Sequence, residues 1–218
     1  AEKPGLCSHG GCPDPDSRSF NPLLYGVLIY RAGVLCRQER GFYFMKVFSV
    51  FGVSNSGKTT TAEAVIAELR RRGYTVGSVK DIHFEAFAID TEGADTWRHR
   101  EAGSGLVIAR GLYETDVMYP FRVPLEKLLL LYDQDFVVLE GANNFLGPAI
   151  ITAHTEEEID QRMRDTVFAV AGRISEKRKE YQGLPIFDGR KHVTELVDLN
   201  IETVPEWTGQ KEWLEQVI

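Results

Sequence analysis

Apolar and polar positions alternate along the chain from Met45 onward in a way that is typical of strands followed by helices. Residues 46–52 form a short apolar run that ends at Gly52, which predicts a buried strand. In residues 60–73 apolar side chains recur at helical spacing up to Gly73, which predicts an amphipathic helix. A second strand is predicted at 74–80. Further apolar, β-branched runs follow at 105–111, 135–142, 149–153 and 166–172, separated by helical patterns at 124–132 and 155–165.

The order of these elements predicts the fold class. Apolar strands interleaved with amphipathic helices are typical of an α/β fold with a mostly parallel sheet and helices on both faces. A last strand and helix are predicted within 184–200, with Val193, Leu196 and Val197 facing inward. We therefore expect one domain over residues 45–218. Residues 1–44 have turn-forming residues and no regular period, which predicts a poorly ordered N-terminal extension.

Composition and charge narrow the classes of partner. The formal net charge is -7 and the pI is near 5.3, so a protein that coats nucleic acid or an anionic membrane is not expected, because both need a cationic face. The apolar run near the N-terminus is too short for a membrane span, which needs about 20 residues. The cysteines all lie within the first 36 residues, so the rest of the chain suits a reducing compartment, and we expect the cytoplasm.

A phosphate-binding motif follows the first predicted strand. Residues 52–59 read G-V-S-N-S-G-K-T, the P-loop pattern of two glycines, a lysine and a hydroxyl at fixed spacing. At a helix N-terminus, unpaired backbone N–H groups and the helix dipole favour phosphate. Lys58 is expected to reach the terminal phosphates and Thr59 to bind Mg²⁺. The predicted nucleotide-binding residues here are Gly52, Ser54, Asn55, Ser56, Gly57, Lys58, Thr59 and Thr60, in a P-loop NTPase-type fold.

A P-loop usually works with an acidic residue at the end of a neighbouring strand. The run 135–140 offers Asp135 and Glu140, which five residues of strand place about 16 Å apart at opposite sheet edges. Ligands bind at the carboxyl ends of parallel strands. Glu140 is therefore the predicted second metal residue, with Thr59 as the first.

Charged residues also follow the second predicted strand. Lys80 closes this strand, and together with Asp81, His83, Asp90 and Asp95 it is expected beyond the same sheet edge as the P-loop. A short helix is predicted from Asp95 or Thr96, and helical spacing puts Asp95 beside His99 and Thr96 beside Arg100. By position, Asp81, His83 and Asp90 all qualify as a general base, and the spacing selects none of them.

At this point the chain resembles the molybdopterin-guanine dinucleotide biosynthesis protein B (MobB) family. The resemblance rests on G-V-S-N-S-G-K-T-T-T, the V-K that closes the second strand, the pattern D-T-x-R-H-R-E-A-G and the later L-E-G. It implies GTP with Mg²⁺ as ligands, weak hydrolysis at best, and a homodimer. The implied partners are a MobA-like nucleotidyltransferase that attaches GMP to molybdopterin, and a molybdopterin intermediate. The residues it carries over are Gly57, Lys58, Thr59, Glu140, Asp90, Asp95, Arg98 and Arg100.

The chain departs from the family pattern at two points, and one alternative function is also considered. Many relatives have K-H where this chain has Lys80 and Asp81, and no N-K-x-D guanine-reading sequence occurs. A preference for guanine over adenine therefore rests on the resemblance alone. The predicted catalytic group is Lys58, Glu140 and Asp90, in at most a slow Mg²⁺-dependent GTPase. The alternative is a small-molecule kinase that uses ATP, because phosphoryl transfer needs the same P-loop and metal.

Overall fold

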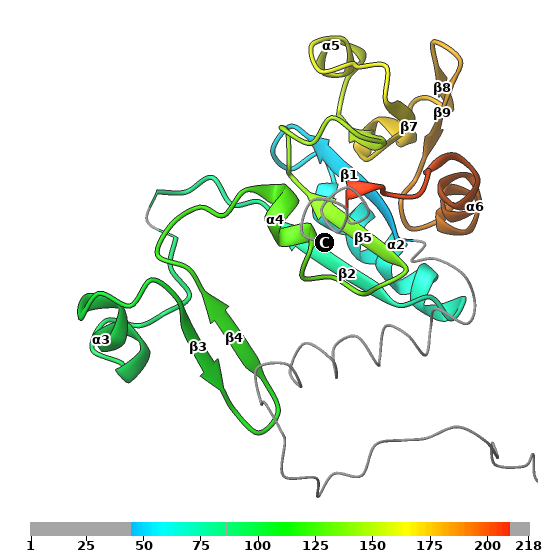
Figure 1. Cartoon of the computed structure of the whole chain (residues 1–218). Helices are drawn as coiled ribbons and strands as arrows, with labels where there is room; N and C mark the ends of the chain where they lie inside the picture. The colour runs from blue at the N-terminus through cyan, green and yellow to red at the C-terminus, as the bar shows by residue number, and fades with distance from the viewer. Residues whose placement is uncertain (1–44, 86, 210–218) are drawn as a thin grey trace, which may run out of the picture. The chain divides into compact units, whose positions relative to one another are not determined.

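The structure, a computed structural model, describes residues 45–85 and 87–209, and the predicted extension at 1–44 lies outside them. A seven-stranded sheet in the order β2-β5-β1-β6-β7-β9-β8 forms its centre (Figure 1). Every neighbouring pair is parallel except β8 and β9. The predicted mostly parallel sheet is confirmed. Its strands are β1 (Lys46–Gly52), β2 (Val76–Lys80), β5 (Phe136–Glu140), β6 (Ala149–Thr152), β7 (Val167–Ala171), β8 (Glu180–Tyr181) and β9 (Leu184–Phe187).

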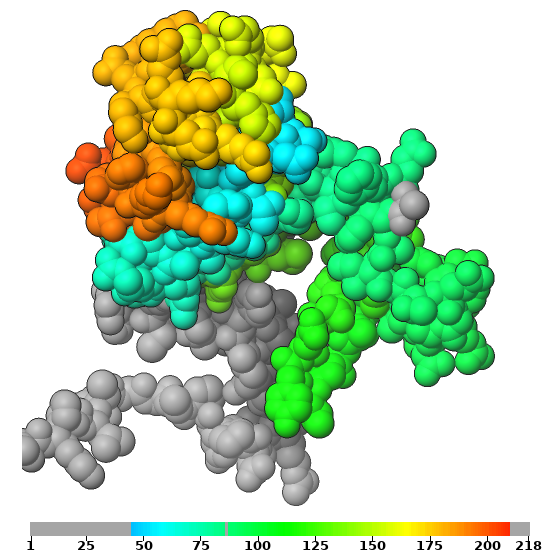
Figure 2. All heavy atoms as spheres, turned by 180° about the vertical axis from the view of Figure 1, so that it is seen from behind, coloured from blue at the N-terminus to red at the C-terminus, as the bar shows by residue number. Residues whose placement is uncertain are grey.

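Two helices cover one face of this sheet. Val65 of α2 (Lys58–Arg71) and Leu196 of α6 (Val193–Thr203) are buried in one apolar cluster with Phe48 and Val50 of β1. The space-filling view shows α6 beside α2 (Figure 2). The inward positions predicted for the last helix are confirmed, because Leu196 and Val197 are fully buried and Val193 is partly buried against the same cluster.

Shorter helical segments cover the opposite face. Leu129 of α4 (Leu125–Leu129) packs with Val47 of β1. Because successive side chains of a strand point to opposite faces, Val47 and Phe48 lie on opposite sides of the sheet. Ile159 of α5 (Glu156–Asp160) and Ile174 of the 3₁₀ helix η1 (Arg173–Glu176) pack with Phe51 and its neighbours. The central strands β1, β5, β6 and β7 are thus buried on both faces, as their continuous apolar runs predict.

The prediction for residues 105–111 was wrong in one respect. The strand forms as β3 (Val107–Arg110), but it pairs antiparallel with β4 (Thr115–Met118) in a separate two-stranded sheet. Ile108 of β3 is 55% exposed. A short apolar run has the same pattern whether its strand lies in the core or in a side sheet, so the sequence could not separate the two cases.

The remaining helix, α3 (Asp95–Glu101), precedes β3 and has no buried residue. None of the helices described has the length and apolar character needed to cross a bilayer.

Candidate functional site

The predicted P-loop connects the end of β1 to the start of α2. Gly52 has φ +146°, and a Cβ at this position would lie 2.0 Å from the carbonyl oxygen of Thr152. The Ser56 hydroxyl lies 2.6 Å from the Thr152 hydroxyl. Gly57 has φ +109° directly before α2 begins at Lys58. Only glycine fits the close approach at Gly52 without strain, so the motif glycine and Thr152 of β6 together fix the loop.

Lys58 folds back over this loop. Its Nζ donates to the carbonyl oxygens of Val53 at 2.6 Å and Gly52 at 3.2 Å. Burial lowers the pKa of Lys58, Glu140 opposes this shift, and the nearby cations Lys80 and Arg162 add to it. Three cationic side chains therefore surround the loop, as expected where a polyphosphate binds.

Glu140 and Thr59 lie together at the carboxyl end of the sheet. The Thr59 hydroxyl donates to Glu140 Oε1 at 2.5 Å, and Lys80 Nζ lies 2.6 Å from the same oxygen. Glu140 thus lies at the same sheet edge as the P-loop, and its role as a metal residue stays a prediction. Asp135 is at the other end of the strand, where it accepts hydrogen bonds from the backbone N–H and hydroxyl of Thr75.

The pair of oxygen ligands suits a hard cation. A hydroxyl and a carboxylate are ligands that Mg²⁺ uses, and Mg²⁺ takes its other ligands from water and phosphate oxygens. The part of the chain that the structure describes has no group of three or more His, Cys, Asp or Glu side chains that could hold a metal alone. The residues therefore fit a Mg²⁺ ion that arrives with a nucleotide.

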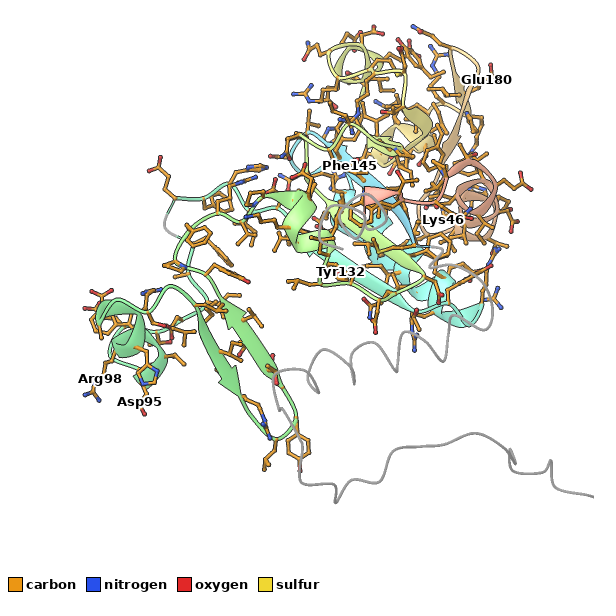
Figure 3. The ribbon with its side chains drawn as sticks, in the orientation of Figure 1. Lys46, Asp95, Arg98, Tyr132, Phe145 and Glu180 are labelled. Carbon is orange, nitrogen blue, oxygen red and sulfur yellow. The ribbon has the colours of Figure 1, made fainter. Side chains whose placement is uncertain are left out.

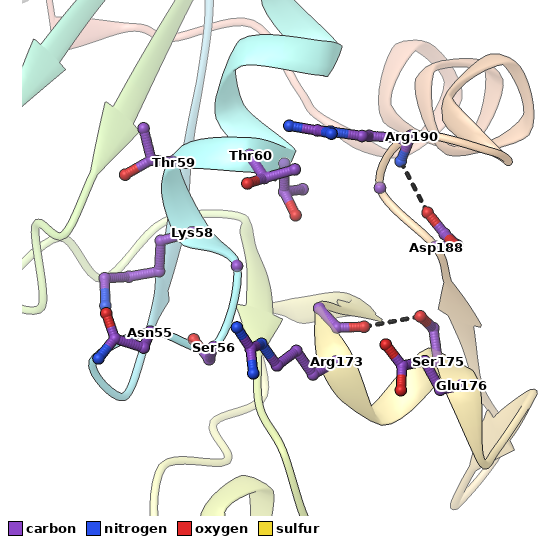
Figure 4. Close-up of a pocket in the computed structure, with 14 residues that line it drawn as sticks. Asn55, Ser56, Lys58, Thr59, Thr60, Arg173, Ser175, Glu176, Asp188 and Arg190 are labelled. Carbon is purple, nitrogen blue, oxygen red and sulfur yellow. Dashed lines mark hydrogen bonds between the residues drawn. The ribbon is translucent and has the colours of Figure 1, made fainter.

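A cleft of about 530 Å³ extends from the P-loop across the end of the sheet (Figure 4). Residues 55–61 form one wall, and the other walls come from the segments that follow β7 and β9. The cleft is large enough for a small organic ligand. Its side chains outside the P-loop and α2 come from Arg173, Ser175, Glu176, Asp188 and Arg190.

Two glycines hold these walls against the P-loop and α2. A Cβ on Gly172 would lie 2.2 Å from the carbonyl oxygen of Ser56, and one on Gly189 would lie 2.7 Å from the hydroxyl of Thr61. The backbone N–H of Arg173 also donates to the Ser56 carbonyl at 3.1 Å. Any larger residue at Gly172 or Gly189 would push the walls apart, so the shape of the cleft depends on these two glycines.

The predicted site residues that follow the second strand, Asp90, Asp95, Arg98 and Arg100, lie outside the cleft. Asp90 accepts hydrogen bonds from the Thr96 hydroxyl at 2.8 Å and the Thr91 N–H at 3.0 Å, at the start of α3. Asp95, Arg98 and Arg100 lie on α3, and Asp95 and Arg98 are exposed (Figure 3). Of the described residues, those that line the cleft include none of these four. The structure thus brings the P-loop and Glu140 together and leaves the α3 group outside the cleft.

The other two candidate bases have partners. Asp81 accepts hydrogen bonds from Arg122 Nη2 at 2.8 Å on both carboxylate oxygens. His83 Nε2 lies 3.3 Å from the carbonyl oxygen of Gly141. Both side chains are tied to their surroundings near the end of β2, and neither belongs to the cleft lining among the residues described.

The sequence analysis expected Lys80 at this sheet edge but gave it no role beside Glu140, and it did not single out Glu176, which lines the cleft. Lys80 is the last residue of β2, and its register partner in β5 is Glu140. Glu176, with the neighbouring wall residues, follows the carboxyl end of a strand in the same sheet. The sequence signal that could have found them is their position directly at or after the carboxyl end of a predicted strand, because ligands bind at that edge of a parallel sheet.

Comparisons with known proteins agree with this arrangement. The family model described as molybdopterin guanine dinucleotide synthesis protein B, MobB, matches residues 47–173. A probable molybdopterin-guanine dinucleotide biosynthesis adapter protein of Bacillus subtilis is 28% identical over 145 residues, which cover 65% of this chain and 84% of that protein. The corresponding adapter protein of Haemophilus influenzae is 35% identical over 116 residues, 51% of this chain and 64% of that protein.

Solved structures show the same fold. The crystal structure of Bacillus subtilis MobB matches with a TM-score of 0.61 and 26% identity over 73% of this chain and 98% of that one. A MobB homologue from Bacillus stearothermophilus matches with a TM-score of 0.53 and 23% identity over 72% and 97% of the two chains. The family match covers more than half of the 218 residues and includes the P-loop, Glu140 and Gly172. The chain therefore belongs to the molybdopterin guanine dinucleotide synthesis protein B family.

Proposed function

We propose that this protein binds GTP with Mg²⁺ and acts as an adapter in the biosynthesis of the molybdopterin guanine dinucleotide cofactor. The observation that carries the proposal is that Lys58 and Thr59 line one cleft and that the Thr59 hydroxyl is bound to Glu140. The loop N–H groups and Lys58 would hold the β- and γ-phosphates, while Thr59 and Glu140 would hold Mg²⁺. The relatives from Bacillus subtilis and Haemophilus influenzae are named as molybdopterin-guanine dinucleotide biosynthesis adapter proteins, which supports a role in this biosynthesis.

Hydrolysis is expected to be slow. A fast NTPase needs a group that orients or activates the attacking water. Asp81 is held by Arg122, Asp90 by Thr96, and His83 lies against the Gly141 carbonyl, so each of the three candidate bases already has a partner among the described residues. Binding would then be the functional event, and the chemistry would belong to a MobA-like nucleotidyltransferase that attaches GMP to molybdopterin. We expect this to take place in the cytoplasm.

A homodimer is the second part of the proposal. All the large apolar side chains that are exposed in the described part of the chain lie between residues 84 and 131, except Leu146. Leu112 is 93% exposed and Tyr113 is 100% exposed, at the turn between β3 and β4. An isolated two-stranded sheet is marginal in water, so a partner surface is expected to cover it. We propose a second copy of the chain as that partner.

Equilibrium binding of GTP and of ATP, each with Mg²⁺, tests the nucleotide proposal, with turnover measured on the same samples. A preference for GTP with turnover far below the kinase range of about 1 to 100 per second would support it. ATP preference with fast, acceptor-stimulated turnover would instead establish the kinase alternative.

Sedimentation analysis of the L112S/Y113S double variant tests the dimer. We expect a dimeric parent and a folded monomeric variant. A parent that sediments as a monomer would contradict the dimer proposal.

A further inference from the structure

The cleft has a polar end that the phosphate-binding groups do not explain. Beyond the P-loop it is walled by η1, which follows β7, and by residues 188–190, which follow β9. These two segments contribute two carboxylates, Glu176 and Asp188, and two guanidinium groups, Arg173 and Arg190. When Lys58 holds the phosphates of a nucleotide, the ribose and base need a second binding region, and this end of the cleft can provide it.

The two carboxylates differ in what they already bind. Asp188 Oδ1 accepts hydrogen bonds from the backbone N–H groups of Arg190 at 3.0 Å and Lys191 at 3.1 Å. These backbone hydrogen bonds, that of Arg190 first, lower the pKa of Asp188. Asp188 Oδ2 also lies 3.6 Å from Lys191 Nζ. Asp188 therefore fixes the turn that leads into α6.

Glu176 has no such partner. Within the described residues its carboxylate takes part in no hydrogen bond and no ion pair, although it lines the cleft. Figure 4 shows Glu176 at the end of η1 on the wall of the cleft, while Arg173 extends toward Ser56. The Arg173 backbone bond to Ser56 keeps that arginine at the phosphate side. The free acceptor at the far end of the cleft is thus Glu176.

We propose that Glu176 selects guanine by accepting hydrogen bonds from its Watson–Crick edge, an inference that rests on the proposed function of nucleotide binding. Guanine presents two adjacent donors there, the N1–H and the 2-amino group. An ionised carboxylate is an acceptor with two oxygens and matches that pair. Adenine places the N1 lone pair at the same position, which faces the carboxylate as a second acceptor. A site that reads donors in this way rejects an analogue that lacks them.

The neighbouring walls support this role. Gly172 holds the start of η1 against the P-loop and Gly189 holds the 188–190 segment against α2, so the backbone of both walls lies close to the phosphate-binding segment. Arg190, whose side chain lines the cleft, offers a planar guanidinium on which a base can stack. This chain has no N-K-x-D sequence, and a carboxylate from the segment after β7 would supply the same chemistry.

Glu176→Gln gives a gain-of-function test. Glutamine keeps one acceptor for N1–H and replaces the other with an amide donor, which clashes with the 2-amino group of guanine but pairs with the 2-oxo group of xanthine. Calorimetric titrations with GTP, ATP and xanthosine triphosphate, all with Mg²⁺, would be run on the full chain, on Glu176→Gln and on Glu180→Gln. Glu180 is exposed on β8 and controls for the lost charge.

We expect the parent and Glu180→Gln to prefer GTP over ATP and xanthosine triphosphate. In Glu176→Gln, GTP affinity should fall on the order of 10- to 100-fold, as for the loss of a charged hydrogen bond, and xanthosine triphosphate affinity should rise. Unchanged GTP preference in Glu176→Gln would overturn the assignment while nucleotide binding stands. A parent chain that binds none of the three nucleotides would overturn the proposed function and this inference together.

Discussion

The hydroxyl of Thr59 and the carboxylate of Glu140 lie 2.5 Å apart although 81 positions separate them in the sequence. The parallel register of β1 and β5, which pairs Val50 with Glu140, brings the strand end beside the start of α2. Lys80 of β2 also reaches Glu140, at 2.6 Å. Three neighbouring elements thus meet at the point where a terminal phosphate and its metal would bind.

Replacing Glu140 with glutamine should remove the Mg²⁺-dependent part of GTP binding. The amide keeps the shape of the side chain but loses the negative charge that attracts the cation. We expect Mg²⁺ affinity to fall roughly 10- to 100-fold, as found when groups around metal sites are changed. GTP titrations with Mg²⁺ and with EDTA measure the effect, and Glu202→Gln on the exposed side of α6 is the control. A Glu140→Gln protein that still gains GTP affinity from Mg²⁺ would remove Glu140 from the metal site.

Gly172→Ala should damage the nucleotide site, whereas Gly73→Ala should not. Gly172 and Gly73 both have φ +92°, so alanine is strained at either position, and the ψ of -158° at Gly172 belongs to a region that only glycine adopts readily. At Gly73 no atom lies within 4 Å of the added Cβ, whereas at Gly172 the Ser56 carbonyl oxygen lies 2.2 Å from it. We expect a weaker GTP affinity for Gly172→Ala and an unchanged one for Gly73→Ala. Equal GTP affinities in the two variants would show that this contact does not shape the P-loop.

Glu68 should make the stability of the fold depend on pH. Hydrogen bonds from Arg71 and then Arg72 lower the pKa of Glu68 to about 2 from an ordinary value of 4.5. Because the folded-state pKa is depressed, this stabilisation is fully present above about pH 4.5 and is lost as the pH falls toward 2. We expect Glu68→Gln to lower the free energy of unfolding at pH 7.

Urea unfolding of the parent and Glu68→Gln at several pH values measures this contribution. The difference between the two proteins should shrink between pH 4.5 and 2. A difference that stays the same from pH 7 down to pH 3 would mean that the arginine contacts do not stabilise the carboxylate.

Asn200→Leu should stabilise the protein. Asn200 of α6 is fully buried in an apolar neighbourhood, and neither its Nδ2 nor its Oδ1 has a hydrogen-bond partner within the described residues. Leaving a polar group buried and unpaired costs about 1–3 kcal/mol. Replacing the amide with an apolar side chain of similar shape should raise the melting temperature. A lower melting temperature for Asn200→Leu than for a conservative Asn200→Gln would count against an unpaired amide.

Much of the site could be predicted from sequence because its groups are local or lie at strand ends. The P-loop depends on one short segment, and Glu140 follows from the rule that ligands bind at the carboxyl ends of parallel strands. Asp135 was correctly placed at the opposite edge by strand length alone.

The parts that were missed depend on contacts between distant segments. The pairing of Lys80 with Glu140 needs the strand order, which places β5 between β1 and β2. The role of Gly172 needs the approach of β7 to the P-loop, and its sequence gives no sign of that contact. β3 was predicted among the strands of the main sheet because a short apolar run has the same pattern in either sheet, and its partner β4 was not predicted.

The most direct measurement of the central claim is calorimetric titration of the full chain and its Lys58→Ala variant with GTP and Mg²⁺. Lys58 is the P-loop group expected to hold the terminal phosphates, and its ammonium donates to loop carbonyls without supporting the core. We expect micromolar binding by the parent, no measurable binding by Lys58→Ala, and the same melting temperature for both. Equal GTP affinity in the two proteins would contradict the assignment of this loop as the nucleotide site.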